Sequence, residues 1–343
     1  MKKVCIIGHF GFGDNMANGQ TIKTKSVTTE LENQLGVDQV IKIDTHGGVK
    51  VLPKIVFQMV NAFKKCKNIV ILPAQNGIKV FVPLCNVLNK VFHRRLHYVV
   101  IGGWLNDFLD DNKYLEKKLR SFKGIYVETN AMRMVLIERG FCNIYIMPNF
   151  KNIKILSEAE LIYRTSEPHK LCTFSRVMKE KGIGEAIDVV SFINEKYNRT
   201  VFTLDIYGQV DSVQIEWFEN LKSSFPPYVS YKGLVPYDRS VEVLKEYYAL
   251  LFPTYYAGEG FAGTLLDAMA AGVPAVASDW KYNSEIVIPG KTGYLFRTND
   301  FKSFCDNVEK SLDDSWNKMK QTCIEEAGYY SPDKAISVLV NKF

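Results

Sequence analysis

The sequence predicts an α/β protein in which two parallel, doubly wound sheets follow each other along the chain. Two observations support this fold class. Short runs of apolar, β-branched residues alternate with longer mixed stretches that have the periodicity of amphipathic helices. These runs fall into two series, one in each half of the chain. Because continuous apolar strands separated by helices form βαβ units with right-handed crossovers, each series predicts one Rossmann-like domain.

The predicted strands of the first series are Val4–Ile7, Val40–Ile43, Ile69–Leu72, Tyr98–Ile101, Ile125–Val127 and Ile144–Met147. Those of the second series are Leu171–Phe174, Phe202–Tyr207, Val229–Lys232, Ala249–Phe252, Pro274–Ala277 and Tyr294–Phe296. Only helical patterns follow, over Phe301–Leu312, Ser315–Ala327 and Pro332–Phe343.

The boundary between the two series is polar. Pro148-Asn149-Phe150 ends the first series, and the polar segment Ser157–Lys170 contains Pro168, as a linker would. We therefore expect an N-terminal domain over residues 1–156 and a C-terminal domain over residues 165–325. The remaining residues, 326–343, form a C-terminal helix able to pack back on the N-terminal domain.

Composition excludes several classes of protein. With 343 residues, 47% hydrophobic and 23% charged, the chain is neither disordered, collagen-like nor a polytopic membrane protein. Its net charge of +6 is unevenly spread, because residues 1–160 hold 23 Lys and Arg against 13 Asp and Glu, whereas the remainder is net acidic. The basic half could face phosphates, nucleic acid or an anionic membrane.

The cysteines and the N-terminus indicate a cytoplasmic protein. The seven cysteines are scattered without a CxxC pair, which fits free thiols better than disulfides or a zinc site. Met1-Lys2-Lys3 precedes only four apolar residues, too few for a signal peptide, and no stretch approaches the ~18–20 apolar residues of a spanning helix. We expect a soluble protein, or a peripheral one at the inner face of the cell membrane.

The loop after the first strand is rich in glycine. It runs from Gly8 through Gly11 and Gly13 to Asp14, and it continues to Gly19 before a helix begins. Glycines there let backbone approach a phosphate or make a tight turn. A dinucleotide site would need GxGxxG spacing and an acid after strand two; Asp44 fits the second condition, but the glycine spacing does not fit the first. The loop is also long enough to reach a ligand that the other domain holds.

Two cations follow the first strand of the second series. Arg176 and Lys181 precede Gly182, at the strand end where α/β sheets bind ligands. Two cations at that edge suit a diphosphate, although a solvated basic turn would have the same pattern.

The most informative block runs from Phe252 to Pro274. A strand ends at Phe252, a loop with three glycines follows, and a helix is expected from about Gly263 to Gly272. Backbone amides at its start could hold a phosphate. Glu259 and Asp267 bracket this loop–helix junction, and carboxylates accept hydrogen bonds from sugar hydroxyls.

This block resembles the donor-site signature of retaining glycosyltransferases of the GT-B fold, family 4 (glycosyl transferases group 1). The matching residues are Glu259-Gly260-Phe261 and, after the second acid, Ala268-Met269-Ala270-Ala271-Gly272-Val273-Pro274. Further matches are Ser278-Asp279-Trp280, Glu285-Ile286-Val287, Gly290–Leu295, Tyr207-Gly208, Tyr231-Lys232-Gly233, and Arg176 with Lys181-Gly182. The resemblance extends over essentially the whole chain and includes members from bacterial capsule and lipopolysaccharide clusters. It implies two Rossmann-like domains that face a cleft.

The resemblance also implies roles for individual residues. Arg176 and Lys181 hold the diphosphate of a nucleotide sugar, and Glu259 contacts the hydroxyls of its sugar. The donor-binding set is Gly19, Gly208, Lys232, Phe261, Ala262, Gly263, Thr264 and Asp267. In that set Asp267 takes the ribose, Thr264 and the helix amides take phosphate, Lys232 and the loop after Gly208 read the base, and Gly19 approaches the phosphate from the N-terminal domain.

Two departures from the family pattern matter. The second acid is Asp267 where the family has Glu, which shortens the side chain by one methylene. The His motif after the fourth strand is replaced by Gly102-Gly103-Trp104, so that contact does not carry over. The resemblance otherwise implies retention of configuration and no cofactor or metal, since cations take the place of the metal and there is no Asp-x-Asp motif.

The expected reaction is transfer of a hexose or N-acetylhexosamine from a nucleotide sugar, with UDP as the expected nucleotide, to a lipid-linked or oligosaccharide acceptor in surface polysaccharide biosynthesis. An epimerase-like enzyme of the same fold and an inactive sugar-nucleotide-binding subunit are the alternatives. The basic N-terminal face could rest on anionic lipid; its cations are Lys54, Lys64, Lys65, Lys67, Lys90, His93, Arg94 and Arg95. We expect no nucleic-acid partner, because no basic motif is interleaved with aromatic residues.

Overall fold

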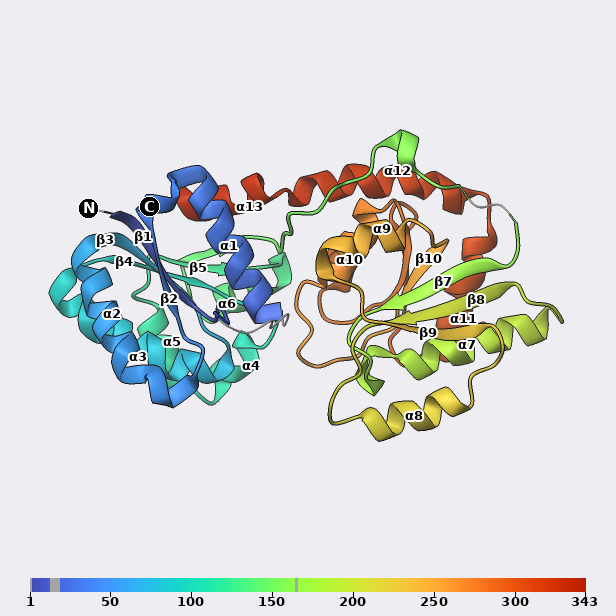
Figure 1. Cartoon of the computed structure of the whole chain (residues 1–343), viewed down its shortest axis with the longest axis horizontal. Helices are drawn as coiled ribbons and strands as arrows, with labels where there is room; N and C mark the ends of the chain where they lie inside the picture. Colours follow the sequence, from blue (N-terminus) through green and yellow to red (C-terminus); the bar gives the residue numbers. More distant parts are fainter. Residues whose placement is uncertain (1, 13–18, 164–165) are drawn as a thin grey trace. The chain divides into compact units, whose positions relative to one another are not determined.

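The computed structural model describes residues 2–12, 19–163 and 166–343, and the chain divides into two units (Figure 1). Unit 1 comprises Met1–Asn152 and Ser331–Phe343, and unit 2 comprises Ile153–Tyr330. Gly13 and Asp14 of the glycine-rich loop lie outside the described residues.

Unit 1 contains a six-stranded parallel sheet in the order β2-β1-β3-β4-β5-β6. Its strands are β1 (Lys2–Gly8), β2 (Val40–Asp44), β3 (Cys66–Leu72), β4 (Arg95–Val99), β5 (Gly124–Val127) and β6 (Ile144–Ile146). The central strands are buried on both faces, so they carry continuous apolar runs rather than alternating ones. Each overlaps the strand that the sequence predicts.

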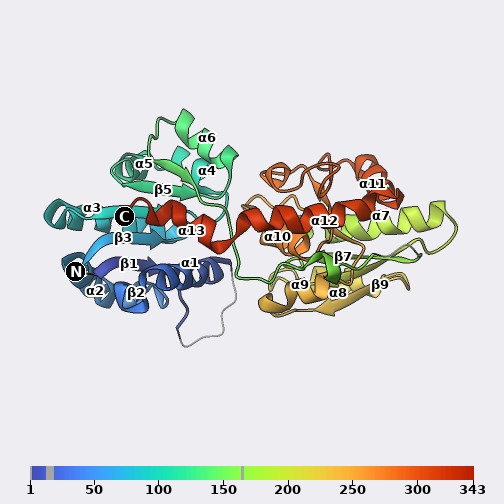
Figure 2. The same cartoon turned by 90° about the horizontal axis from the view of Figure 1, so that it is seen from above.

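Helices cover both faces of this sheet (Figure 1). They are α1 (Gly19–Leu35), α2 (Leu52–Lys65), α3 (Gln75–Phe92), α4 (Leu105–Asp110), α5 (Lys113–Leu119), α6 (Asn130–Glu138) and α13 (Pro332–Val340). Helix α13 packs beside α1, where Ala335, Ile336 and Leu339 are buried in the same core as Val27 and Leu31 (Figure 2). The last helix of the chain thus belongs to the core of unit 1.

Unit 2 repeats the architecture with the strand order β12-β11-β10-β7-β8-β9. Its strands are β7 (His169–Phe174), β8 (Phe202–Tyr207), β9 (Val229–Gly233), β10 (Ala249–Phe252), β11 (Ala275–Ser278) and β12 (Gly293–Phe296). All of these pairs are parallel, and each strand overlaps its predicted counterpart. Because β7 and β10 are neighbours, the loops that follow them leave the same edge of the sheet side by side.

Two hydrophobic clusters sandwich the second sheet. The helices are α7 (Ile183–Lys196), α8 (Ile215–Ser223), α9 (Ser240–Leu244), α10 (Gly263–Ala270), α11 (Phe301–Glu309) and α12 (Ser315–Ala327). One cluster joins α7, α8 and α11 to the sheet, and the other joins α9, α10 and the C-terminal part of α12 to the opposite face (Figure 1). This two-sided burial confirms the predicted doubly wound arrangement.

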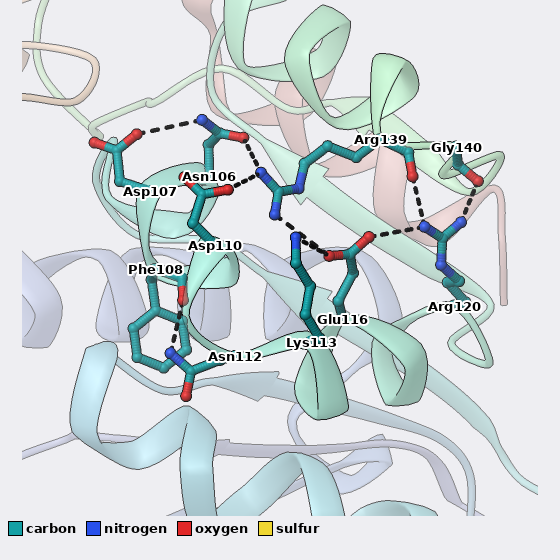
Figure 3. Close-up of polar contacts among 10 residues, drawn as sticks. All are labelled: Asn106, Asp107, Phe108, Asp110, Asn112, Lys113, Glu116, Arg120, Arg139 and Gly140. Carbon is teal, nitrogen blue, oxygen red and sulfur yellow. Dashed lines mark hydrogen bonds and ion pairs between the residues drawn. The ribbon is translucent and has the colours of Figure 1, made fainter.

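A network of ion pairs holds α4 and α5 against the end of α6 in unit 1 (Figure 3). Arg139 donates to Asp110 Oδ1 at 2.7 Å and to Glu116 Oε2 at 3.3 Å, and Arg120 donates to Glu116 Oε1 at 2.8 Å. Burial favours the neutral form of Glu116, but these two guanidinium groups outweigh it and hold the pKa of Glu116 below its ordinary value. The network therefore fixes α4, which follows directly after Gly102-Gly103-Trp104.

Replacing Arg139 should destabilise unit 1 in a pH-dependent way. Arg139→Ala removes the partner that bridges Asp110 and Glu116, so we expect the free energy of unfolding to fall by about 1–2 kcal/mol at pH 7. The folded pKa of Glu116 is depressed; its contribution is therefore complete above the ordinary Glu pKa of about 4.3 and disappears as the pH falls through the folded value. Urea unfolding at pH 7 and below pH 4 measures both effects.

Arg133→Ala is the matched control, since Arg133 lies on the same helix and no side-chain partner for it is found among the described residues. An equal loss of stability in the two variants, or a difference from wild type that does not shrink in acid, would contradict this account.

Candidate functional site

The sequence-predicted residues of unit 2 gather at the carboxyl edge of its sheet. Arg176 and Lys181 lie in the loop after β7, and Glu259 lies in the loop after β10. Those two strands are hydrogen-bonded neighbours, with Leu171 opposite Ala249. Residues that are distant in the sequence are therefore brought together, at the edge where parallel α/β sheets bind ligands.

A salt bridge between Lys181 and Glu259 forms the centre of the site. Lys181 Nζ lies 2.5 Å from Glu259 Oε2, and each side chain is only 10% exposed. The Thr254 hydroxyl donates to the same oxygen at 2.8 Å. Both contacts use Oε2, so among the described residues Glu259 Oε1 has no partner and can accept a hydrogen bond from a ligand.

The backbone around Gly182 determines where Lys181 lies. Lys179–Lys181 form a single 3-10 turn, and Gly182 follows it in the left-handed region, with φ of 73°. A Cβ at residue 182 would lie 2.3 Å from the Pro253 carbonyl oxygen. The Tyr255 amide also donates to the Glu180 carbonyl at 2.8 Å. The absence of a side chain at Gly182 thus allows the loop after β7 to contact the loop after β10.

Tyr256 brings the second cation to the same place. Its ring centre lies 5.3 Å from Lys181 Nζ and 6.0 Å from Arg176 Cζ, which is within cation–π range. Arg176 is 53% exposed and pairs with Asp211 at 3.0 Å. The Val213 amide first, and Arg176 second, keep the pKa of Asp211 low. Because the Arg176 side chain is half exposed, solvent screens this pair, and Arg176 can turn toward an anionic ligand at small cost.

The N-terminus of α10 supplies backbone donors next to the salt bridge. Helix α10 begins at Gly263, three residues after Gly260, and within the described part of the chain its N-cap residue, Ala262, makes no side-chain cap hydrogen bond. Such amides lack intrahelical acceptors and attract anions. The Thr264 hydroxyl donates to the Phe174 carbonyl at 2.7 Å, so its own proton ties α10 to β7. A phosphate here would therefore be met by the backbone amides of Gly263 and Thr264.

Three more predicted residues lie around α10. Asp267, one turn into the helix, is buried with 2% of its surface exposed, and Ala262 is the N-cap residue. Phe261 is buried and packs edge-on against the ring of Tyr330, with centroids 5.1 Å apart. The side chain of Phe261 therefore belongs to the core of unit 2.

The residues predicted to read a base lie at the β8–β9 side of the edge. Gly208 follows β8 directly with φ of 135°, and a Cβ there would lie 1.7 Å from the Ser175 carbonyl oxygen. The side chain of Lys232 is 43% exposed and contacts Asp205 at 3.4 Å. In the described part of the sheet β9 pairs only with β8, so the outer backbone groups of β9 are available to a planar ligand.

Sequence reasoning missed how the loop after β10 is braced, although Ser278 and Trp280 match the family pattern. Ser278 donates to the Thr254 carbonyl at 2.5 Å, and the Trp280 indole donates to the Tyr256 carbonyl at 2.8 Å. Thr254 and Tyr256 lie inside the block that the sequence marks, but they carry no charge that would single them out. Asp211 carries no sequence signal at all, because only the fold brings it to Arg176.

In unit 1, Gly19 is the first residue of α1, and a Cβ there would meet no atom within 4 Å. Asp44 is engaged by backbone: Oδ1 accepts from the Phe10 and His46 amides and Oδ2 from the Phe12 amide, each at 2.9 Å. Burial opposes ionisation of Asp44, but these amides outweigh it and lower its pKa. Asp44 thus connects the loops after β1 and β2, whereas the acid of a dinucleotide site would have its carboxylate available for the ribose hydroxyls.

Two general features concern metals and membranes. Among the described residues, no cluster of three or more His, Cys, Asp and Glu side chains has the proximity to hold a metal ion. In the same part of the chain, every helix is too short or too polar to cross a bilayer.

Residues 162–328 match the family model described as Glycosyl transferases group 1. The capsular polysaccharide biosynthesis glycosyltransferase CapM of Staphylococcus aureus is 26% identical over 140 residues, which is 40% of this chain and 35% of CapM. The GtfA subunit of the UDP-N-acetylglucosamine–peptide N-acetylglucosaminyltransferase of Streptococcus pneumoniae is 30% identical over 149 residues, which is 43% of this chain and 27% of GtfA. The aligned stretches thus span about a third or less of these relatives.

The fold is shared with solved structures over the whole chain. Anabaena HepE, in complex with UDP-glucose, superposes with a TM-score of 0.73 at 13% identity and covers 100% of both chains. This likeness confirms the predicted pair of Rossmann-like domains of the GT-B class. The cleft between them stays a prediction.

Gly182 offers a test of how the site is assembled. Gly182→Ala combines a left-handed backbone with a Cβ 2.3 Å from a carbonyl oxygen, so we expect a loss of at least about 2 kcal/mol in the free energy of unfolding. Gly184→Ala is the control, because a Cβ at this helical position meets no atom within 4 Å and Ala favours the helix. Denaturant unfolding that shows equal stability for the two variants would contradict the tight approach.

Proposed function

We propose that this chain, whose residues 162–328 match the Glycosyl transferases group 1 family model, transfers a hexose or N-acetylhexosamine from a nucleotide sugar to an acceptor. The observation that carries the proposal is the buried Lys181–Glu259 pair beside the uncapped start of α10. This arrangement offers positive charge and backbone donors to a diphosphate, and a carboxylate oxygen to a sugar, within one loop junction.

The diphosphate is the part of the donor that the site fits best. In the ligand-free chain the charge of Lys181 is balanced by one carboxylate, and a diphosphate brings a larger negative charge into competition with it. Lys181, Arg176 and the amides of Gly263 and Thr264 then surround the phosphates. They stabilise the charge that develops on the leaving diphosphate, which is electrostatic catalysis without a nucleophile on the protein.

The remaining donor contacts follow from the same placement. Glu259 Oε1 accepts from a hydroxyl of the sugar, and Asp267 accepts from the ribose. Backbone groups of β9 and of the loop after Gly208 form hydrogen bonds with the base. The proposed nucleotide is UDP, which is supported by the UDP-glucose bound to HepE and by the UDP-N-acetylglucosamine in the name of GtfA.

Transfer proceeds with retention in this proposal. The bond from the anomeric carbon to the phosphate oxygen breaks, and the acceptor oxygen forms its bond on the same face of the sugar. The departing phosphate oxygen takes the proton of the acceptor hydroxyl. The two cations supply the charge stabilisation that a divalent metal gives elsewhere, so we propose activity without added metal.

The proposed acceptor is a lipid-linked or oligosaccharide chain in surface polysaccharide biosynthesis, in line with the name of the CapM relative. Two neighbouring helices of unit 1 support a membrane role. We define the docking surface as Lys54, Phe57, Lys64 and Lys65 of α2 with Val80, Val87, Lys90 and Val91 of α3. Phe57, Val87 and Val91 are 69%, 61% and 72% exposed, and all four lysines are exposed.

Helical spacing places each set of side chains on one exposed face of its helix, and α2 contacts α3. Apolar side chains interleaved with lysines suit the interface of an anionic bilayer. One residue of the predicted basic face is corrected by the structure. The Arg94 guanidinium donates to the Phe63 carbonyl at 2.7 Å, so it joins α2 to the start of β4 instead of facing solvent freely.

Removing either member of the central pair should abolish transfer. We expect Glu259→Ala and Lys181→Ala each to lower the rate of sugar transfer at least a hundredfold while the fold is kept, because each removes a contact to the reacting part of the donor. Lys179→Ala is the control, since its exposed side chain lies in the same turn but away from Glu259. Transfer is measured with UDP-sugars and a lipid-linked acceptor, beside circular dichroism.

Near-wild-type rates in both variants would overturn the assignment. The two alternatives have their own signatures. An inactive subunit would bind UDP-sugars but neither transfer nor slowly hydrolyse them, and an epimerase would change the sugar without an acceptor.

Flotation with lipid vesicles tests the docking surface. Lys64→Glu/Lys65→Glu should largely abolish flotation with phosphatidylglycerol vesicles, and Phe57→Ser should weaken it, since one change removes charge attraction and the other apolar insertion. Lys302→Glu/Lys318→Glu, which reverses two exposed lysines of unit 2, should float like wild type. Two results would contradict membrane binding by the docking surface. One is that wild type floats with neutral vesicles but not with phosphatidylglycerol vesicles, and the other is that both double variants lose flotation to the same extent.

A further inference from the structure

Unit 1 contains a cavity that the donor site does not use. It has a volume of about 290 Å³ and lies between the carboxyl end of β2 and the first two turns of α2. Side chains that line it include Phe12, Lys42, Asp44, His46, Lys54 and Gln58. The volume suffices for a phosphate group together with part of an attached sugar or chain.

The lining favours an anion. Lys42 and Lys54 contribute two positive charges, and Gln58 adds an amide donor. Lys42 also pairs with Glu32 at 2.7 Å, but Lys42 is partly exposed and this contact is exchangeable. The acid in the wall, Asp44, has both carboxylate oxygens turned to backbone amides, so it offers a ligand little acceptor capacity.

One wall of the cavity is held in place. His46 Nδ1 lies 3.2 Å from His9 Nε2, and His9 Nδ1 lies 2.9 Å from Thr21 Oγ1. The His46 amide also donates to Asp44. These contacts join the loops after β1 and β2 to helix α1, so the ring of His46 is already oriented before any ligand arrives.

The cavity adjoins the docking surface. Lys54 belongs to both, and Phe57, which is 69% exposed, lies one turn further along α2 beside Gln58. A ligand in the cavity would therefore have its polar end at Lys54 and could extend an apolar tail over Phe57. A cationic cavity beside an apolar, cationic helix face suits a ligand that has a phosphate group at one end and an apolar chain at the other.

We infer that this cavity binds the phosphate group of an amphiphilic acceptor whose apolar chain lies along the docking surface. The inference rests on the proposed function and gives the acceptor a chemical class. The cavity lies within unit 1, so it can be tested separately from the donor site of unit 2.

Calorimetric titration of the full chain, in vesicle-free buffer, tests the inference with three probes: farnesyl phosphate, farnesol and inorganic phosphate. We expect wild type to bind farnesyl phosphate at least tenfold more tightly than either other probe. Lys54→Gln/Gln58→Ala should lower the affinity for farnesyl phosphate at least tenfold, and Lys42→Gln should lower it severalfold. Lys25→Gln, which removes an exposed charge of α1, should bind like wild type.

The affinity of each variant for UDP, measured in parallel, shows that it is folded and that the donor site works. Farnesyl phosphate binding that is absent in wild type, or unchanged in the cavity variants, overturns the inference. If farnesol binds as tightly as farnesyl phosphate, the cavity does not recognise the phosphate group. If inorganic phosphate binds as tightly as farnesyl phosphate, the apolar chain makes no contact, and the ligand need not be an amphiphile. Loss of UDP binding by wild type would count against the proposed function instead.

Discussion

The donor-site account depends on one interaction, the ion pair of Lys181 and Glu259. Two charges at 10% exposure have lost most of their hydration, and they recover that cost only through good geometry and further hydrogen bonds. Thr254 supplies one such bond, and the rings of Tyr256 and Phe252 lie within cation–π range of Lys181. A diphosphate can offer Lys181 more negative charge than Glu259 does. In the proposed reaction the diphosphate takes the place of Glu259 beside Lys181, and this exchange frees the carboxylate for the sugar.

The fold makes this pair possible by sheet topology. Lys181 and Glu259 are 78 residues apart in sequence, and they meet because β7 and β10 are adjacent parallel strands. Gly182 and Gly208 then let loops approach backbone carbonyls more closely than any side chain would allow. In unit 1 the same logic operates through Asp44, which ties the loops after β1 and β2 and so shapes the wall of the cavity.

The strands were predictable, because strands buried on both faces need continuous apolar runs. The position of Arg176, Lys181 and Glu259 at one edge of the second sheet was predictable too, since each follows a predicted parallel strand. Their roles toward a donor stay predictions. Pairings were not predictable. Nothing in the sequence connects Arg176 to Asp211 or turns the Thr264 hydroxyl toward Phe174, since both contacts depend on strand order. The burial of individual apolar residues was not predictable either, since in α3 Val91 is 72% exposed whereas Ile78, Phe81, Val82 and Cys85 are buried. Periodicity alone cannot distinguish a buried apolar residue from an exposed one.

The most direct test of the central claim compares UDP affinity in wild type, Lys181→Ala and Glu259→Ala, by calorimetry with GDP alongside. If the diphosphate displaces Glu259 from Lys181, the Lys181→Ala variant should bind UDP at least tenfold more weakly than wild type. The Glu259→Ala variant should bind UDP as tightly as wild type or more tightly. Weakening of UDP by Glu259→Ala as large as that by Lys181→Ala would contradict the exchange, because it would show that the carboxylate supports the diphosphate rather than competing with it.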